Sequence, residues 1–152
     1  MKKLYYAAII GIFAALSCSC EKPDSISSHT AEKVKQEFLH AWNSYLTYAE
    51  GDDMLLPLSQ TGRNWYAVSL VMTPLDAFDT MVIMGLDKEA DRAKQLVLDN
   101  LSFDHDMSVQ VFEVTIRLLG GLISAYQLDE DPRFLELAED LGNGAFVVQA
   151  DL

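Results

Sequence analysis

Apolar side chains recur along most of this chain at steps of three and four residues, the spacing of one face of an α-helix. Residues 51–71 fit neither a helical nor a strand period, and Pro57, Gly62 and Asn64 indicate an ordered loop there. No segment alternates apolar and polar residues as a half-buried strand does. We therefore expect an all-α fold of paired antiparallel helices joined by short connections.

Five segments carry the helical spacing, and each has an apolar face that we expect to be buried. They are residues 30–50 with Val34, Phe38, Trp42, Tyr45 and Ala49; residues 74–84; residues 87–101 with Ala93, Leu96, Val97 and Leu101; residues 108–128 with Phe112, Ile116, Leu119, Ile123 and Tyr126; and residues 132–142 with Phe134, Leu135, Ala138 and Leu141.

Capping residues mark the ends of these helices. Thr73 and Asp87 are expected N-caps, and Asp131 followed by Pro132 is a typical helix start. Gly85 stands where the second helix is expected to stop.

The start of the chain resembles an export signal. Lys2 and Lys3 precede an apolar stretch over residues 4–16 that is too short to span a bilayer. Cys18 and Cys20 follow, as in a bacterial lipoprotein processing site where a new N-terminal cysteine is lipidated.

These features predict an exported lipoprotein anchored to the membrane on the periplasmic or cell-surface side, with either cysteine as the lipidation site. Ordinary secretory cleavage is the alternative. We interpret residues 1–20 as the signal peptide and the Ser-rich residues 21–29 as a polar tether without structure.

Charge and cysteine count narrow the range of functions. The formal net charge of −12 at pH 7 disfavours binding to nucleic acid or anionic lipid headgroups. Both cysteines lie in the signal-like segment, which excludes structural disulfides, cysteine-ligated zinc and a thiol nucleophile in the mature chain. Function is expected to depend on carboxylates, Arg, His or hydroxyls.

A polar stripe on the helix over residues 108–128 is the strongest candidate for chemistry. Glu113, Arg117, Gly120, Gly121 and Ser124 share one stripe of a helix that is otherwise apolar. A helix that is apolar over most of its circumference is usually buried, so the Glu and Arg would face an internal cavity. The alternative is a surface ion pair beside a glycine notch for helix packing.

Asp76 and Asp79 form a similar stripe on the helix over residues 74–84. They either line the same cavity as Glu113 or serve the fold, Asp76 in a capping box and Asp79 as a hydrogen-bond anchor for a loop.

Two other groups are weaker candidates. Asp104–Asp106 lacks the Gly and distal Glu of a calcium loop and is interpreted as a turn. Trp42, Trp65 and Tyr66 have rings that can stack on a sugar, although aromatics at helical spacing, such as Trp42, more often belong to a core.

Two longer segments, Thr73–Leu86 and Val111–Tyr126, resemble signature segments of the class I α-mannosidases, glycoside hydrolase family 47. The resemblance extends from about Lys33 to Asn143 and is reinforced by the order of three further segments, Phe38–Tyr45, Pro57–Ser59 and Asn64–Trp65.

The resemblance implies part of an (α/α)7 toroid and an inverting exo-α-1,2-mannosidase that acts on mannose-rich oligosaccharides. It implies that Glu113 is a catalytic acid and that Arg117 contacts the substrate site. Asp76 and Asp79 match the family pattern without an assigned task. The family's Ca²⁺, its direct protein ligand and the other acidic site residues are expected to belong to later parts of the barrel, so no metal ligand is assigned here.

Residues 30–143 are accordingly interpreted as a partial catalytic domain, and residues 144–152 depart from the family pattern. A frameshift or premature stop is the simplest explanation, and we expect the 152-residue chain alone to aggregate and to be inactive. The alternatives are a non-catalytic helical lipoprotein that binds glycan or protein, and an inactive gene remnant.

Overall fold

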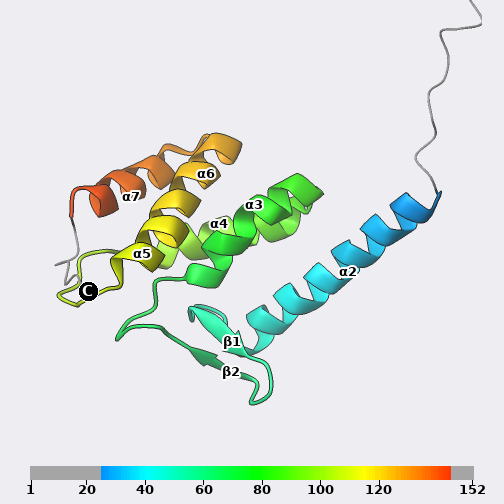
Figure 1. Ribbon diagram of the computed structural model, residues 1–152, viewed down its shortest axis with the longest axis horizontal. Helices are drawn as coiled ribbons and strands as arrows, with labels where there is room; N and C mark the ends of the chain where they lie inside the picture. The colour runs from blue at the N-terminus through cyan, green and yellow to red at the C-terminus, as the bar shows by residue number, and fades with distance from the viewer. Residues whose placement is uncertain (1–24, 145–152) are drawn as a thin grey trace, which may run out of the picture. The chain divides into compact units, whose positions relative to one another are not determined.

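The computed structural model describes residues 25–144. Figure 1 shows their elements, which are α2 Ser25–Tyr48, β1 Met54–Leu56, β2 Thr61–Arg63, α3 Met72–Met84, α4 Asp87–Asn100, α5 Val111–Glu113, the π-helical segment η1 Val114–Leu119, α6 Gly120–Asp129 and α7 Pro132–Gly142. The predicted signal peptide, with Cys18 and Cys20, lies outside the described residues, as does the predicted tail from residue 145 onward.

Residues up to Glu37 form one unit, of which the structure describes 25–37, the first part of α2. The helix begins at Ser25 rather than at Thr30, so the end of the segment expected to be an unstructured tether is helical. Within this unit the Gln36 amide donates to Glu32 at 3.4 Å, an exposed contact one turn apart.

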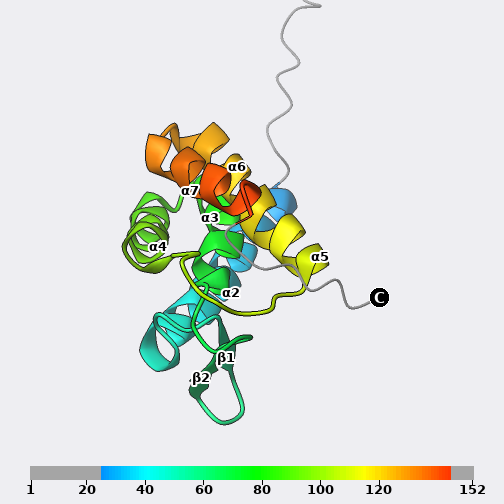
Figure 2. The same cartoon turned by 90° about the vertical axis from the view of Figure 1, so that its left-hand side faces the viewer.

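The second unit begins at Phe38 and consists mainly of helix pairs. Figures 1 and 2 both show α4 alongside α3, and α7 alongside α6. The paired helices confirm the predicted all-α architecture. The segment expected to be a loop also contains an antiparallel hairpin, in which Met54 pairs with Arg63 and Leu56 with Thr61. Its three-residue strands are too short to show a period of two in the sequence.

Two predicted N-caps are wrong. The residue that caps α3 is Val71, which has left-handed φ and ψ of 50° and 41° and makes no side-chain capping bond. The Thr73 hydroxyl donates instead to the Asp53 carbonyl at 2.6 Å. Asp87 is the first residue of α4, and Leu86 holds the cap position.

Two other helix boundaries agree with the prediction. Gly85 ends α3 in the left-handed conformation at φ 67°, which costs a glycine little. The Asp131 side chain caps α7 by accepting from the Arg133 N–H at 3.1 Å, with Pro132 at the first helical position. Hydrogen bonds from Arg133 and Lys94 hold the pKa of the Asp131 carboxyl well below its usual range.

Most of the predicted core positions are buried. The predictions for Val34 and Leu135 are wrong, because these side chains are 50% and 36% exposed. The confirmed positions are Trp42, Tyr45, Ala49, Ala93, Leu96, Val97, Leu101, Phe134, Ala138 and Leu141.

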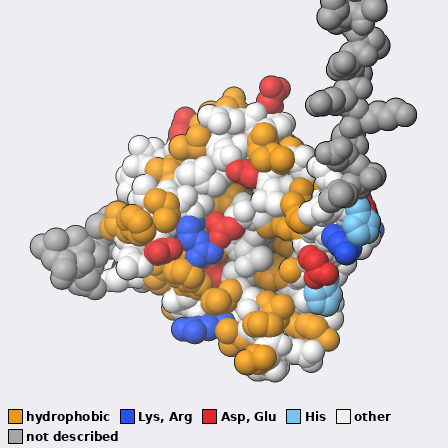
Figure 3. Space-filling view, turned by 45° about the vertical axis from the view of Figure 1, so that its right-hand side comes forward, with side chains coloured by type: hydrophobic (Ala, Val, Ile, Leu, Met, Phe, Trp, Pro, Cys, Tyr) orange, Lys and Arg blue, Asp and Glu red, His pale blue; other side chains and the backbone are white. Residues whose placement is uncertain are grey.

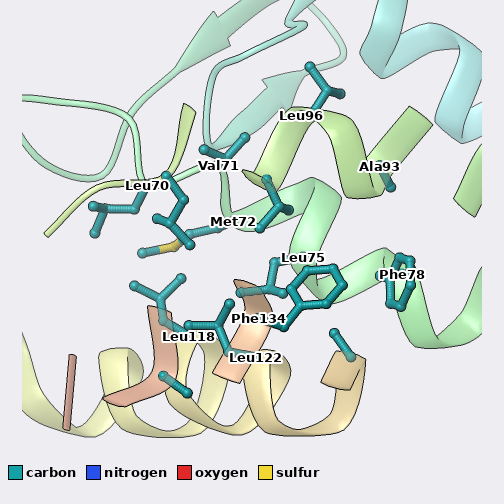
Figure 4. Close-up of a cluster of buried hydrophobic side chains, with 14 of the residues drawn as sticks. Leu70, Val71, Met72, Leu75, Phe78, Ala93, Leu96, Leu118, Leu122 and Phe134 are labelled. Atoms are coloured by element: carbon teal, nitrogen blue, oxygen red, sulfur yellow. The ribbon is translucent and has the colours of Figure 1, made fainter. Parts of the chain in front are cut away.

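The apolar stripe predicted for the helix over residues 108–128 is partly wrong: Leu119 and Tyr126 pack against the core, but the other three residues do not. Phe112, Ile116 and Ile123 are 67%, 54% and 42% exposed. The buried side chains of the helix are instead Val114, Leu118, Leu122 and Ala125. Figure 4 shows Leu118 and Leu122 pointing from this helix toward the cluster that contains Leu75 and Phe134.

Two properties of this helix explain the error. It is apolar on both faces, so its sequence period does not select one. The π-helical η1 also widens the turn: the Gly120 N–H donates to the Thr115 carbonyl five residues earlier, which puts an α-helical projection out of phase.

The length and apolar composition of Val111–Asp129, with a mean hydropathy of 1.2, would also suit a membrane span. The same composition is expected of a helix enclosed within a larger helical fold.

Candidate functional site

The candidate site forms where α3 crosses the helix made of η1 and α6. Gly121 makes this approach close, because a Cβ placed on it would lie 3.0 Å from Leu75 Cγ. Leu75 is itself 1% exposed, so it fills the space that the glycine leaves. This contact brings the carboxylates of α3 next to the polar stripe that begins at Glu113.

Arg117 is the centre of the polar cluster. Its Nε donates to Asp76 Oδ2 at 2.9 Å, and its Nη2 donates to the same oxygen. Its Nη1 lies 4.0 Å from Glu113 Oε2, an ion pair without a hydrogen bond. The structure thus brings together three predicted site residues from two helices.

The cluster is neither fully buried in an internal cavity nor fully exposed as a surface ion pair, the two alternatives that the sequence left open. The Arg117 and Glu113 side chains are 24% and 26% exposed, and that of Asp76 is 36% exposed. Figure 3 shows acidic and basic side chains next to one another on a surface with many hydrophobic side chains. Asp76 is an ion-pair partner across helices, so its interpretation as a capping-box residue is wrong.

Trp65 completes the cluster from the loop after β2. The Arg117 guanidinium carbon lies 4.5 Å from the centroid of the Trp65 ring, the geometry of a cation–π contact. Trp65 remains 40% exposed. The sequence indicated this residue only as an aromatic ring able to stack on a sugar, and no spacing rule linked it to Arg117, 52 positions later in the numbering. Trp42 is 4% exposed and stacks on Tyr45, so it belongs to the core.

Asp79 lies one turn of α3 beyond Asp76 and contacts a different partner. Ser124 on α6 donates to Asp79 Oδ2, so the carboxylate anchors one helix to the other rather than to a loop. Asp79 Oδ1 is buried, and no described residue donates to it. A buried acceptor without a donor is unusual and marks a position where a further polar group would be favourable.

The described residues do not provide a metal centre. Between residues 25 and 144 no group of three or more His, Cys, Asp or Glu side chains is arranged to hold an ion. Asp104–Asp106 lies in the irregular segment between α4 and α5. The donor set found here therefore does not fit the calcium that the family resemblance implies.

Comparisons with known proteins give the class of this fold and site. Residues 37–147 match the family model for glycosyl hydrolase family 47. The chain is 47% identical over 110 residues to the endoplasmic reticulum mannosyl-oligosaccharide 1,2-alpha-mannosidase of Rattus norvegicus. It is 42% identical over 120 residues to a mannosyl-oligosaccharide 1,2-alpha-mannosidase of Arabidopsis thaliana. The aligned parts cover 72% and 79% of this chain but only 16% and 21% of these relatives.

A solved structure agrees with this result. The alpha-1,2-mannosidase from Trichoderma reesei is 31% identical, with a TM-score of 0.67 over 75% of this chain and 26% of that one. The chain belongs to glycosyl hydrolase family 47. Its helix pairs are part of the (α/α)7 barrel of that family.

The same relatives correct the predicted localisation. They are eukaryotic proteins, and the Rattus norvegicus relative is named as an enzyme of the endoplasmic reticulum. The prediction of a membrane-anchored bacterial lipoprotein is therefore wrong. A basic start followed by a short apolar stretch is also typical of ordinary secretory signals, so the pattern at the N-terminus does not select a lipid anchor.

Proposed function

We propose that residues 30–143 form part of the catalytic domain of an inverting exo-α-1,2-mannosidase, in which Glu113 donates the proton. The proposed substrate is an oligosaccharide with terminal α-1,2-linked mannose, as the names of the relatives suggest. The observation that carries the proposal is the cluster of Glu113, Arg117 and Asp76, built from two helices of a family 47 fold.

The geometry gives each residue of the cluster a different role. Asp76 accepts two hydrogen bonds from Arg117 and so fixes the guanidinium, while Glu113 lies 4.0 Å from the guanidinium and makes no hydrogen bond to it. We assign Glu113 as the general acid, Arg117 as a substrate-binding residue, and Asp76 and Asp79 as residues that line the cavity and hold it in shape.

An inverting glycosidase also needs a second carboxylate that activates water from the opposite face of the sugar. Asp76 is bound to Arg117 and Asp79 to Ser124, so neither is assigned this role. Calcium enters the proposal only through the family, and no step is assigned to it because the described residues do not form its site. We therefore expect no mannose release by the 152-residue chain alone.

A segment exchange tests the role of Glu113. Residues 38–142 of this chain would replace the matching helices of the Trichoderma reesei enzyme, and mannose release from α-1,2-mannobiose would be measured. Substituting Glu113→Gln in the active exchange is expected to lower kcat by about 10²–10⁴-fold, the usual contribution of a general acid. Glu136→Gln, at an exposed position on α7, is the matched control and should leave kcat unchanged.

Two outcomes would contradict the proposal. The first is an exchange enzyme whose turnover survives Glu113→Gln, which would remove Glu113 from proton transfer. The second is mannose release by the unmodified 152-residue chain, which would show that the cluster does not need a second carboxylate from elsewhere in the barrel.

A further inference from the structure

Among residues 25–144, Asp53 is the one charged residue whose side chain is buried, with 0% exposure. The residue lies just before β1, in a Gly-Asp-Asp run that the sequence presents as an ordinary polar turn. A carboxylate in such a place is unfavourable unless donors surround it. Its surroundings therefore show what it holds in place.

Four donors converge on the Asp53 carboxylate; three come from the segment between β2 and α3, and the fourth is the backbone N–H of Met72, the first residue of α3. Oδ1 accepts from Leu70 N at 2.6 Å, from Met72 N at 3.3 Å and from Ser69 Oγ at 3.2 Å. Oδ2 accepts from Trp65 N at 2.9 Å. One side chain thus binds both halves of residues 64–73, which run from the end of β2 into the first turn of α3 and which we call the tryptophan loop.

The backbone of Asp53 holds the two ends of the tryptophan loop. Its N–H donates to Asn64 Oδ1 at 2.8 Å, and its carbonyl accepts from Thr73 N at 3.1 Å and from Thr73 Oγ1. Main chain and side chain together therefore fix the loop at its beginning, its middle and its end.

A strained residue shows how strongly the carboxylate shapes this loop. Val71 has a φ of 50°, which is unfavourable for a β-branched side chain. This conformation turns the N–H groups of its neighbours, Leu70 and Met72, toward the same oxygen of Asp53. Such a pair of N–H groups is a backbone nest, a structure that binds anions. Strain of this kind persists where the surroundings require it, and it often occurs near functional sites.

The tryptophan loop contacts the candidate site through Trp65. The Trp65 N–H is the donor to Asp53, and the ring of the same residue lies against Arg117, which Asp76 holds from another side. Asp53 itself makes no hydrogen bond or ion pair with Arg117, Glu113 or Asp76. Asp53 therefore reaches the cluster in two ways, through the position of Trp65 and through the start of α3, the helix that carries Asp76. The Trp65 contact is the direct one, because the ring lies against Arg117 itself.

We propose that Asp53 is a positioning residue, which sets the orientation of Arg117 by fixing the tryptophan loop and the Trp65 ring. That the orientation of Arg117 matters for mannosidase activity depends on the proposed function being correct. The positioning itself does not, and it can be measured in the 152-residue chain without substrate.

The substitution Asp53→Asn tests the proposal with little change in shape. An amide keeps one acceptor oxygen, which can serve Leu70, Met72 and Ser69, but it turns an NH2 group toward the Trp65 N–H. The variant therefore breaks the Trp65 bond selectively. The readout is the Arg117 Nε–H resonance in a ¹H–¹⁵N spectrum, which the Trp65 ring current shifts.

We expect Asp53→Asn to move the Arg117 resonance in the same direction as Trp65→Leu, which removes the ring directly. We also expect the Trp65 amide to exchange with solvent roughly tenfold faster, as for the loss of one hydrogen bond to a charged acceptor. The matched control is Phe134→Leu, a core substitution on α7 whose ring contacts Phe78. It should lower Tm but leave the Arg117 resonance unchanged.

A milder variant covers the case in which Asp53→Asn does not fold. Ser69→Ala removes one of the four donors and keeps the carboxylate, so it should fold and shift the Arg117 resonance part of the way. The proposal is overturned if a folded Asp53→Asn or Ser69→Ala leaves this resonance unmoved while Trp65→Leu moves it. It is also overturned if Trp65→Leu has no effect, because the ring would then not contact Arg117 in solution.

A shifted resonance in a chain whose segment exchange releases no mannose would refute the proposed function and leave the positioning role intact. An active exchange with an unmoved resonance would do the reverse. The two failures are therefore distinguishable.

Discussion

At the scale of single residues, the Tyr45 hydroxyl shows how a buried polar group closes a turn. It donates to the Asp52 carbonyl at 2.8 Å and accepts from the Gly51 N–H at 3.2 Å. Tyr45 is 2% exposed, and this burial raises the pKa of its phenol to about 12. The end of α2 and the approach to the hairpin are thus fixed by one side chain that must stay neutral.

We predict that Tyr45→Phe lowers the free energy of unfolding by about 1–3 kcal/mol, because two backbone groups lose their partner. Urea denaturation measures this change, and Tyr48→Phe, at an exposed position, is the control. An equal change in both variants would contradict the prediction.

The pH dependence of stability follows from the raised pKa of Tyr45. Because the folded pKa is above the usual value of 10, the contribution is fully present below about pH 10 and is lost as the pH rises through about 12. Tyr45→Phe should lack this part of the alkaline loss of stability, while keeping the same profile near neutral pH.

At the scale of elements, the two glycines at the start of α6 differ in what they contact: Gly121 is packed against α3, and Gly120 is exposed. A Cβ on Gly121 would press on Leu75 at 3.0 Å, whereas a Cβ on Gly120 would lie 3.7 Å from the Thr115 carbonyl, an ordinary contact. Gly120→Ala is therefore expected to stabilise the helix by about 0.5–1 kcal/mol through reduced backbone entropy of the unfolded chain.

Gly121→Ala gains the same entropic term but must displace the buried Leu75, so we predict that it is the less stable of the two variants. Thermal unfolding of the pair measures the difference. A higher Tm for Gly121→Ala than for Gly120→Ala would show that α3 and α6 are not closely packed in solution.

The elements also show why some of the structure was predictable and some was not. Asp131 and Pro132 mark the start of α7 because capping is local chemistry, readable over a few residues. Thr73 has the same local signal but serves Asp53, 20 positions earlier, so the tertiary contact overrides the cap. The role of Asp53 carries no sequence signal, since its partners are mainly backbone N–H groups, which every residue type except proline supplies.

The candidate site shows the same division. Helical spacing predicted the stripe of Glu113 and Arg117, and it placed Asp76 and Asp79 together on another helix. That Arg117 lies between Asp76 and Trp65 depends on the crossing of α3 with η1 and on the tryptophan loop, which only the fold reveals.

At the scale of the whole molecule, the helix over residues 111–129 exposes apolar side chains that no described residue covers. Phe112 and Ile116 are more than half exposed, and Ile83 on α3 is 78% exposed. The chain spans about a sixth to a quarter of the relatives it matches, in a family whose fold is a closed barrel of helix pairs. Side chains that face other helices in a barrel are expected to be apolar, and exposed apolar patches favour association.

We predict that the double substitution Phe112→Ser and Ile116→Thr reduces aggregation of the 152-residue chain without lowering its Tm, because neither side chain belongs to the described core. Light scattering against concentration and binding of a hydrophobic dye measure the first effect, and thermal unfolding the second. The control is Leu118→Ser on the same helix, where a fully buried side chain is lost and Tm should fall by many degrees. If the double substitution lowers Tm as much as Leu118→Ser does, this face is packed in solution and the association has another cause.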